Sequence, residues 1–139
     1  MTSTNTKVTV HTLSKIITDG DVLHSELSAD GVMYKADDSY VIEYEDTQQA
    51  CHTKVVVDAV SVCVIHTGSV QSTMLFKNNY IHKSNYGIEY GDLDMEVRTD
   101  RIFVDLNIQG GSIELWYELV LGGSVSNAKI IMEITKAEA

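Results

Sequence analysis

Apolar and polar side chains alternate along five stretches of the chain. In each stretch every second residue is apolar, and most of the residues between them are polar or charged. This period of two, with one face in water, is typical of half-buried antiparallel strands. The five apolar rows are Tyr40, Ile42 and Tyr44; Leu93, Met95 and Val97; Ile102, Val104, Leu106 and Ile108; Ile113, Leu115, Tyr117, Leu119 and Leu121; and Ile130, Met132 and Ile134.

Helical periodicity is weak throughout the chain. The best helical candidates are Ser14–Leu27, which Asp19-Gly20-Asp21 interrupts, and Thr47–Thr53, which is too short. We therefore predict an all-β fold.

Short turn signals separate the alternating stretches, and connections this short join antiparallel neighbours. They predict a meander of about eight to ten strands, which removes its exposed edges by closing into an antiparallel up-and-down barrel. A two-sheet sandwich is the alternative, but it needs long crossover loops. The predicted turns are Asp37-Asp38, Asp58-Ala59, Thr67-Gly68-Ser69, Thr99-Asp100, Gln109-Gly110-Gly111 and Gly122-Gly123-Ser124.

The length of 139 residues suits one domain, which we place at residues 7–136 after a disordered tail at 1–6. The N-terminus does not resemble a signal peptide, and no apolar run reaches the ~18–20 residues of a membrane helix. The two cysteines, Cys51 and Cys63, are then expected to be free thiols in a reducing cytoplasm. The formal net charge of −10 disfavours nucleic acid and anionic membrane surfaces as partners.

Cys51 and His66 are the residues that most invite a chemical interpretation. If Asp58-Ala59 is a two-residue turn, Val57 pairs with Val60, and this register places Cys51 opposite His66 on the inner face. Cys63 then faces outward and cannot reach Cys51. Two ligands are too few for zinc, and a nucleophile needs an oriented third group that the sequence does not show. We therefore expect a buried thiol beside an imidazole, with no metal, no cofactor and no enzyme activity.

Asp92, Asp94 and Glu96 share one face of a strand, which we interpret as a solvated outer face rather than a calcium site. Trp116 also faces outward by parity. It either covers a barrel end or lies under the N-terminal segment, or, together with Val120, marks an interaction surface such as a homodimer contact.

Tyrosines accumulate on the predicted inner face. A wall of tyrosine, histidine and aliphatic side chains can line a cavity for a small, partly apolar ligand, and it can equally be the filled core of a small barrel. The candidate ligand-binding residues are Tyr44, His66, Tyr86, Tyr90 and Tyr117.

The order and spacing of several short motifs resemble the YwiB-like family of uncharacterised bacterial proteins, over about Lys7 to Thr135. The motifs are Tyr44-Glu45, the run from Val60 to Gly68, Met74-Leu75-Phe76, the run from Tyr86 to Leu93, and the run from Gly111 to Tyr117. The resemblance implies a calycin-like β-barrel, akin to lipocalins, and no established activity. His66 stands where family members usually carry Arg, and Ile88 where they usually carry Thr, so any ligand held by that Arg and Thr is expected to differ here.

Overall fold

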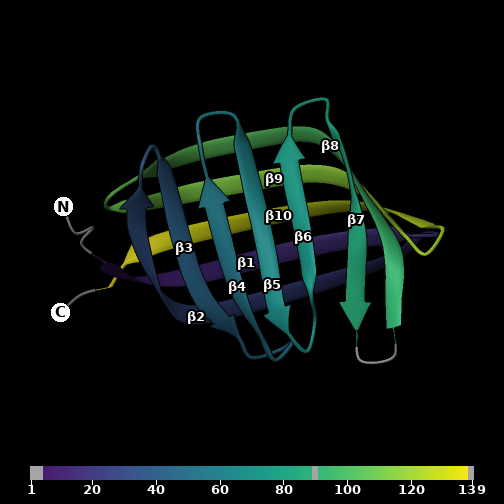
Figure 1. Ribbon diagram of the computed structural model, residues 1–139, viewed down its shortest axis with the longest axis horizontal. Coiled ribbons are helices and arrows are strands. Elements are labelled where there is room, and N and C mark those ends of the chain that lie inside the picture. Colours follow the sequence, from purple (N-terminus) through teal and green to yellow (C-terminus); the bar gives the residue numbers. More distant parts are fainter. Residues whose placement is uncertain (1–4, 89–90, 138–139) are drawn as a thin grey trace.

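The computed structural model describes residues 5–88 and 91–137, and these residues form ten β-strands joined by short turns (Figure 1). This confirms the all-β prediction. In the described ranges no helix is long and apolar enough to cross a membrane. The strands are β1 (Thr6–Thr18), β2 (Asp21–Ala36), β3 (Ser39–Asp46), β4 (Cys51–Val57), β5 (Ser61–Gly68), β6 (Ser72–Lys77), β7 (Ile81–Ile88), β8 (Gly91–Asn107), β9 (Gly110–Leu121) and β10 (Ser124–Lys136).

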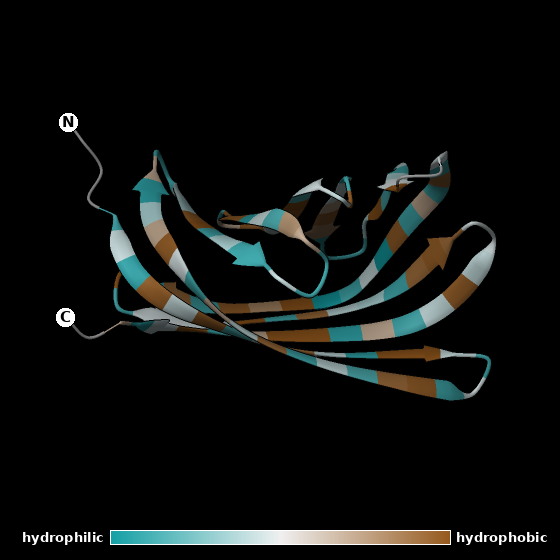
Figure 2. Cartoon of the chain, turned by 90° about the horizontal axis from the view of Figure 1, so that it is seen from below, coloured by the Kyte–Doolittle hydropathy of each residue, from teal (hydrophilic) through white to brown (hydrophobic). Residues whose placement is uncertain are grey.

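The strands form one antiparallel sheet in the order β6-β5-β4-β3-β2-β1-β10-β9-β8-β7. Consecutive strands are neighbours, and β1 pairs with β10 to join the two ends of the meander. Figure 1 shows β3 to β7 crossing in front of the longer β8, β9, β10, β1 and β2, and Figure 2 shows the two layers from below. The predicted up-and-down barrel is confirmed. Its strands run from Thr6 to Lys136, so Thr6 belongs to β1 rather than to the tail.

The barrel closes incompletely between β6 and β7. One bridge joins Gln71 and Gly87, whose backbone groups exchange hydrogen bonds of 2.9 and 2.7 Å. Further along the seam, Ser84 Oγ donates to the Thr73 carbonyl (3.0 Å) and the Leu75 N–H donates to His82 Nδ1 (3.3 Å). Side chains thus replace part of the ladder that backbone groups form between the other strands.

The predicted turn at Thr99-Asp100 is wrong. The structure has one long strand, β8, with a register shift between Thr99 and Arg101 that leaves Asp100 as the extra residue of a β-bulge. A bulge bends a strand and interrupts its pairing, so its sequence looks like that of a turn. β8 pairs with β7 from Gly91 to Arg98 and with β9 from Met95 to Asn107.

The first helical candidate, Ser14–Leu27, is in fact the β1–β2 hairpin. Asp19 and Gly20 both have positive φ (51° and 84°), as a two-residue hairpin turn requires. Further along β2, the strand approaches β3 so closely at Gly31 that a Cβ would lie 2.5 Å from the Glu43 carbonyl oxygen. Three other predicted turns shift slightly: Gly68 ends β5, Gly110 begins β9, and Ser124 begins β10.

The predicted β4–β5 register is also wrong, by two residues. Val57 pairs with Val62, and Val60 lies in the turn with 60% of its surface exposed. The Asp58 carboxylate lengthens the turn because its Oδ1 accepts the N–H groups of Val60 (3.0 Å) and Ser61 (2.8 Å). A shift of two preserves which residues face inward, so the assignment of the faces is unaffected.

One end of the lumen is filled by side chains, and we call it the filled end. The rings of Phe76 and Tyr117 pack edge to face there, with centroids 4.8 Å apart. Aliphatic side chains from the opposite layer close around them. The fully buried residues at this end are Val8, Val10, Met33, Ile42, Val55, Val62, Phe76 and Ile113.

Candidate ligand-binding cavity

The other end of the lumen holds a cavity of about 500 Å³, which we call the lumen cavity. Inner-face residues from the described strands other than β4 line it, together with residues of the β3–β4 and β5–β6 turns. Leu23, Gln48 and Gln49 line the cavity and are exposed to solvent, so the cavity has a mouth at the end where these residues lie.

One wall of the lumen cavity is polar. The inner rows of several strands are apolar at the filled end and turn polar toward the mouth. In β1 the row runs from Val8 and Val10 to Thr12 and Ser14, and the rows of β3 to β6 change in the same direction. The polar side chains on this wall are Thr12, Ser14, Ser25, Tyr44, Asp46, His66, Ser72 and Tyr86.

The facing wall is apolar because most of the residues that β8, β9 and β10 contribute to the cavity lining are aliphatic. Leu119 and Leu121 continue the row of Leu115 and Tyr117 on β9. The apolar side chains of this wall are Met95, Leu115, Leu119, Leu121, Ile130 and Met132. A cavity with one polar and one apolar wall suits an amphipathic molecule.

His66 lies in the polar wall beside Cys51, although not in the predicted register. His66 pairs with Thr53 and Cys51 pairs with Gly68, and the diagonal contact brings Cys51 Sγ to 3.6 Å from His66 Nδ1. Thr53 Oγ1 lies 3.0 Å from the same nitrogen. Burial lowers the pKa of His66 and raises the pKa of the Cys51 thiol. The expected pair of a buried thiol and an imidazole is present, and both groups are neutral near pH 7.

Three of the four predicted tyrosines line the lumen cavity with His66. They are Tyr44, which is 6% exposed, Tyr86 and Tyr117. Burial raises the pKa of all three, so each phenol keeps its proton and offers a neutral hydroxyl. Tyr90 lies outside the described residues.

Sequence reasoning missed five polar residues of this wall, Thr12, Ser14, Ser25, Asp46 and Ser72, and of these Asp46 and Ser72 are buried. Asp46 is 6% exposed, and its Oδ1 accepts the N–H groups of Gln48 (3.0 Å) and Gln49 (3.1 Å). Ser72 is 7% exposed, and its Oγ has no hydrogen-bond partner among the described residues. Strand parity could have found both, because Asp46 continues the row of Ile42 and Tyr44, and Ser72 continues that of Phe76 and Met74.

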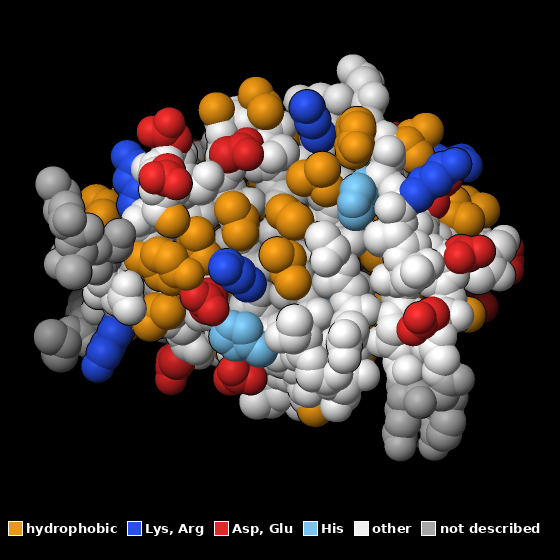
Figure 3. Space-filling model, viewed as in Figure 1, with side chains coloured by type: hydrophobic (Ala, Val, Ile, Leu, Met, Phe, Trp, Pro, Cys, Tyr) orange, Lys and Arg blue, Asp and Glu red, His pale blue; other side chains and the backbone are white. Residues whose placement is uncertain are grey.

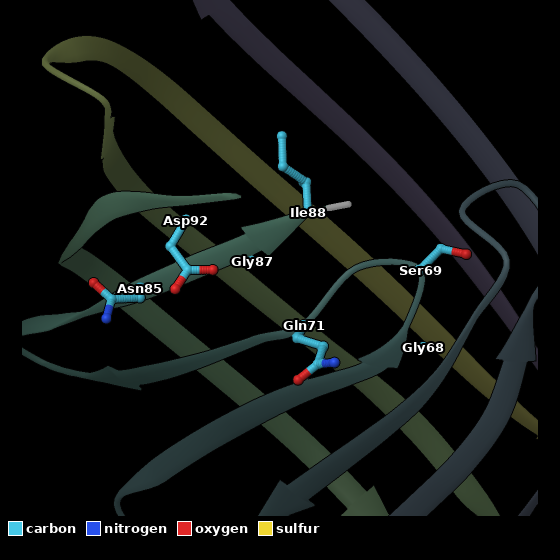
Figure 4. A pocket seen from close by; sticks show the side chains of 7 residues that line it. All are labelled: Gly68, Ser69, Gln71, Asn85, Gly87, Ile88 and Asp92. Carbon is cyan, nitrogen blue, oxygen red and sulfur yellow. The ribbon is translucent and has the colours of Figure 1, made fainter. Parts of the chain in front are cut away.

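A second hollow, of about 540 Å³, lies where the β5–β6 turn meets β7 and β8 (Figure 4). Asn85 and Asp92 lie on one side of it, and Ser69 and Gln71 lie on the other. Ile88 borders this hollow rather than the lumen cavity. Because its walls hold few apolar groups, we take the lumen cavity as the candidate site.

Trp116 faces outward as predicted, but it lies in the middle of β9 rather than at a barrel end. Arg101 and Lys129 on the neighbouring strands lie over its ring, at 5.3 and 4.1 Å from the centroid. Such cation–π contacts cover the ring with charged groups. Val120 lies further along β9, between Glu96 and Val125. In the described ranges no three His, Cys, Asp or Glu side chains are placed to hold a metal ion.

The outer face of β3 to β6 mixes apolar and charged side chains (Figure 3). On this face His52 lies between two carboxylates, at 2.8 Å from Glu43 and 2.7 Å from Glu45. These partners raise the pKa of His52, in contrast to the lowered pKa of His66 on the inner face of the next strand. Asp94 and Glu96 also face outward as predicted, because Met95 and Val97 between and beside them are buried.

Together these features define a class of protein: an up-and-down β-barrel whose lumen is filled at one end and hollow at the other. Residues 8–134 match the family described as a domain of unknown function, DUF1934, and the chain belongs to this family. The uncharacterized beta-barrel protein YwiB of Bacillus subtilis (strain 168) is 24% identical over 119 residues, which are 84% of each chain. The crystal structure of the ywiB protein from Bacillus subtilis matches with a TM-score of 0.85 over 98% of this chain and 96% of that one, at 24% identity. The resemblance inferred from the motifs is confirmed.

Proposed function

We propose that this protein binds a small, partly apolar ligand in the lumen cavity. The observation that carries this proposal is the cavity of about 500 Å³ between a polar and an apolar wall. Its volume lies within the range of roughly 300–1,000 Å³ that is usual for small-molecule sites. At the filled end, side chains pack the lumen of the same ten-stranded barrel. The number of strands therefore does not by itself explain the cavity at the other end.

The state of the polar wall supports binding rather than catalysis. A buried hydroxyl without a partner, as at Ser72, costs free energy that a ligand or a water molecule can recover. A catalytic Cys–His pair would need a thiolate, whereas burial shifts Cys51 and His66 toward their neutral forms. We also infer a cytoplasmic location, because Cys51 and Cys63 are both free thiols.

The first test is the intact mass of freshly purified protein, under native and then denaturing conditions. A mass excess that disappears on denaturation reveals a co-purified ligand and allows its identification. The second test uses Nile red, a neutral dye that fluoresces in apolar surroundings, and therefore also applies when the protein purifies empty. Saturable binding of one dye per chain is expected.

Two matched variants locate the binding. Leu119→Trp adds an indole inside the lumen cavity, and Val120→Trp adds the same group on the outer face of the same strand. Loss of dye binding in Leu119→Trp, with binding retained in Val120→Trp, supports the proposal. Circular dichroism and thermal melting check that both variants fold. Equal dye binding by the folded Leu119→Trp variant and the unchanged protein contradicts a lumen site.

A second candidate function is a protein-interaction module, such as a homodimer, that uses the outer surface near Trp116 and Val120. Its support is a partly apolar row next to Trp116, in which Leu13 and Phe103 are 40% and 52% exposed. The cations over Trp116 weaken it, since two copies meeting symmetrically would bring Arg101 and Lys129 toward their own counterparts. A monomeric mass in light scattering contradicts the homodimer, and a dimer that Phe103→Glu dissociates supports it.

A further inference from the structure

We propose that the lumen cavity selects an amphipathic ligand whose polar end is a protonated amine, with Asp46 as its counter-ion. The inference rests on the proposed function and adds the chemical class of the ligand to it.

The charge of the cavity wall is the first argument. Of the described residues that line the cavity, Asp46 is the one with a formal charge, and none is Lys or Arg. An anionic head group would therefore meet a carboxylate without a compensating cation. A cationic head group would form an ion pair in partly desolvated surroundings, where such pairs are stronger than in water.

The geometry of Asp46 is the second argument. Both hydrogen bonds that the described residues give to this carboxylate fall on Oδ1, from the N–H groups of Gln48 and Gln49. They fix the side chain in the turn and leave Oδ2 for another donor. Burial of a carboxylate is costly unless a cation or enough donors compensate it. The N–H groups of Gln48 and Gln49 supply part of that compensation, and a ligand ammonium group at Oδ2 would add to it.

The polar wall that holds Asp46 also carries neutral acceptors, and an ammonium group carries three donors. Ser72, in the same wall, has a buried Oγ without a partner in the described part of the chain. Tyr44 is next but one to Asp46 along β3 and also lines the cavity. Burial is the main cause of the shifted pKa values of Tyr44 and His66, and the charge of Asp46 contributes to both, so the three groups share one environment.

The apolar wall provides for the rest of the ligand. Leu119, Leu121 and Ile130 face the polar wall across the cavity and can cover an alkyl or aryl group. At the mouth, Asp19 and Asp21 flank the β1–β2 turn in exposed positions, near the lining residues Ile16 and Leu23. Their charge, with the net charge of −10, attracts cations toward the opening.

The test is displacement of Nile red by three probes with the same chain: n-decylamine, n-decanol and n-decanoic acid. They are compared below the concentrations at which they form micelles, at about pH 7.5, where the amine is protonated and the acid is ionised. The amine is expected to displace the dye at a concentration at least about tenfold lower than the alcohol, and the acid is expected to be the weakest.

Asp46→Asn is the informative variant, and Asp58→Asn is its matched control. Asp58 uses its Oδ1 for the same kind of turn at the filled end, and the amide oxygen of Asn can accept the same N–H bonds in both turns. In Asp46→Asn the amine should lose its advantage over the alcohol, while displacement by the alcohol stays unchanged. In Asp58→Asn both values should remain those of the unchanged protein.

The outcomes separate this inference from the proposed function. If the dye binds in the lumen but the amine is no better than the alcohol or the acid, the amine preference is wrong and lumen binding stands. A preference that survives in Asp46→Asn also overturns the inference, because Asp46 is then not the counter-ion. If Nile red does not bind and none of the three probes raises the melting temperature, the proposed function fails, and this inference with it.

Discussion

The two ends of the lumen are built from the same strands and differ in what their inner rows carry. At the filled end, valines, isoleucines, Met33 and Phe76 are buried in one hydrophobic cluster. At the open end, threonine, serine, tyrosine and histidine face leucines across about 500 Å³. The filled end is thus tightly packed, and its packing holds the walls of the open end apart.

The comparison shows that the side chains, and not the backbone, decide where this barrel is hollow. In the inner row of β1, Val8 and Val10 at the filled end are followed by the short polar residues Thr12 and Ser14 at the open end. Ser14 reaches less far into the lumen than a valine would, and the hydroxyls of Thr12 and Ser14 require partners. The change of residue type thus adds hydrogen-bonding capacity to the wall of the cavity.

The largest expected effect comes from removing a large side chain at the filled end. Phe76→Ala should lower the free energy of unfolding by about 3–5 kcal/mol, because it leaves a cavity among fully buried neighbours and removes the contact with Tyr117. Leu119→Ala in the lumen cavity should cost only about 1 kcal/mol, because this side chain already borders empty space. Urea denaturation followed by circular dichroism measures both. Equal losses would show that the open end is as tightly packed as the filled end.

A smaller effect is expected to distinguish two buried hydroxyls of the inner face, one bonded to His66 and one without a partner in the described residues. Thr53 is fully buried and its Oγ1 bonds His66, so Thr53→Val should lower the free energy of unfolding by about 1 kcal/mol. Ser72→Ala removes a hydroxyl that has no partner in the described ranges, so it should be neutral or stabilising by a few tenths of a kcal/mol. The measurement is urea denaturation of ligand-free protein. A clear loss in Ser72→Ala would mean that a water molecule or another partner already satisfies Ser72.

Much of the fold could be predicted from the sequence, because each apolar row fixes a strand and its inner face. Positions 113, 115 and 117, for example, are all buried as their alternation indicates. The particular pairing of β1 with β10 could not be predicted from the sequence, since β1 has polar residues on both faces near the mouth. Asp100 and Val60 were misjudged because a bulge and a four-residue turn use the same residue types as a two-residue turn.

The site was predictable only in part. The alternation of side chains along the strands predicted that Tyr44, His66 and Tyr117 share the inner face. The structure places all three around one cavity. Parity does not tell whether a polar inner row borders a cavity or is packed against other side chains, because that depends on the facing strands. Asp46 was overlooked since an aspartate at the end of a strand is usually a turn residue, and here it is both a turn residue and a cavity residue.

The smallest effect is a difference in pH dependence between His66 and His52. Burial lowers the pKa of His66 below its ordinary value of 6.5, so the unfolded chain binds the proton more readily and stability falls as the pH drops through 6.5. Glu43 and Glu45 raise the pKa of His52, so its contribution is fully present below 6.5 and is lost as the pH rises through the folded-state value. His52 is 39% exposed, and solvent screening keeps its contribution small.

NMR titration of the imidazole protons should therefore find His66 titrating below 6.5 and His52 above it. In thermal melts from about pH 7.5 to about pH 5.5, His66→Gln should flatten the loss of stability and His52→Gln should steepen it. An amine at Asp46 would oppose protonation of His66 further, because it places a second positive charge in the same cavity. Decylamine should then shift the titration of His66 to lower pH and leave that of His52, on the outer face, where it was.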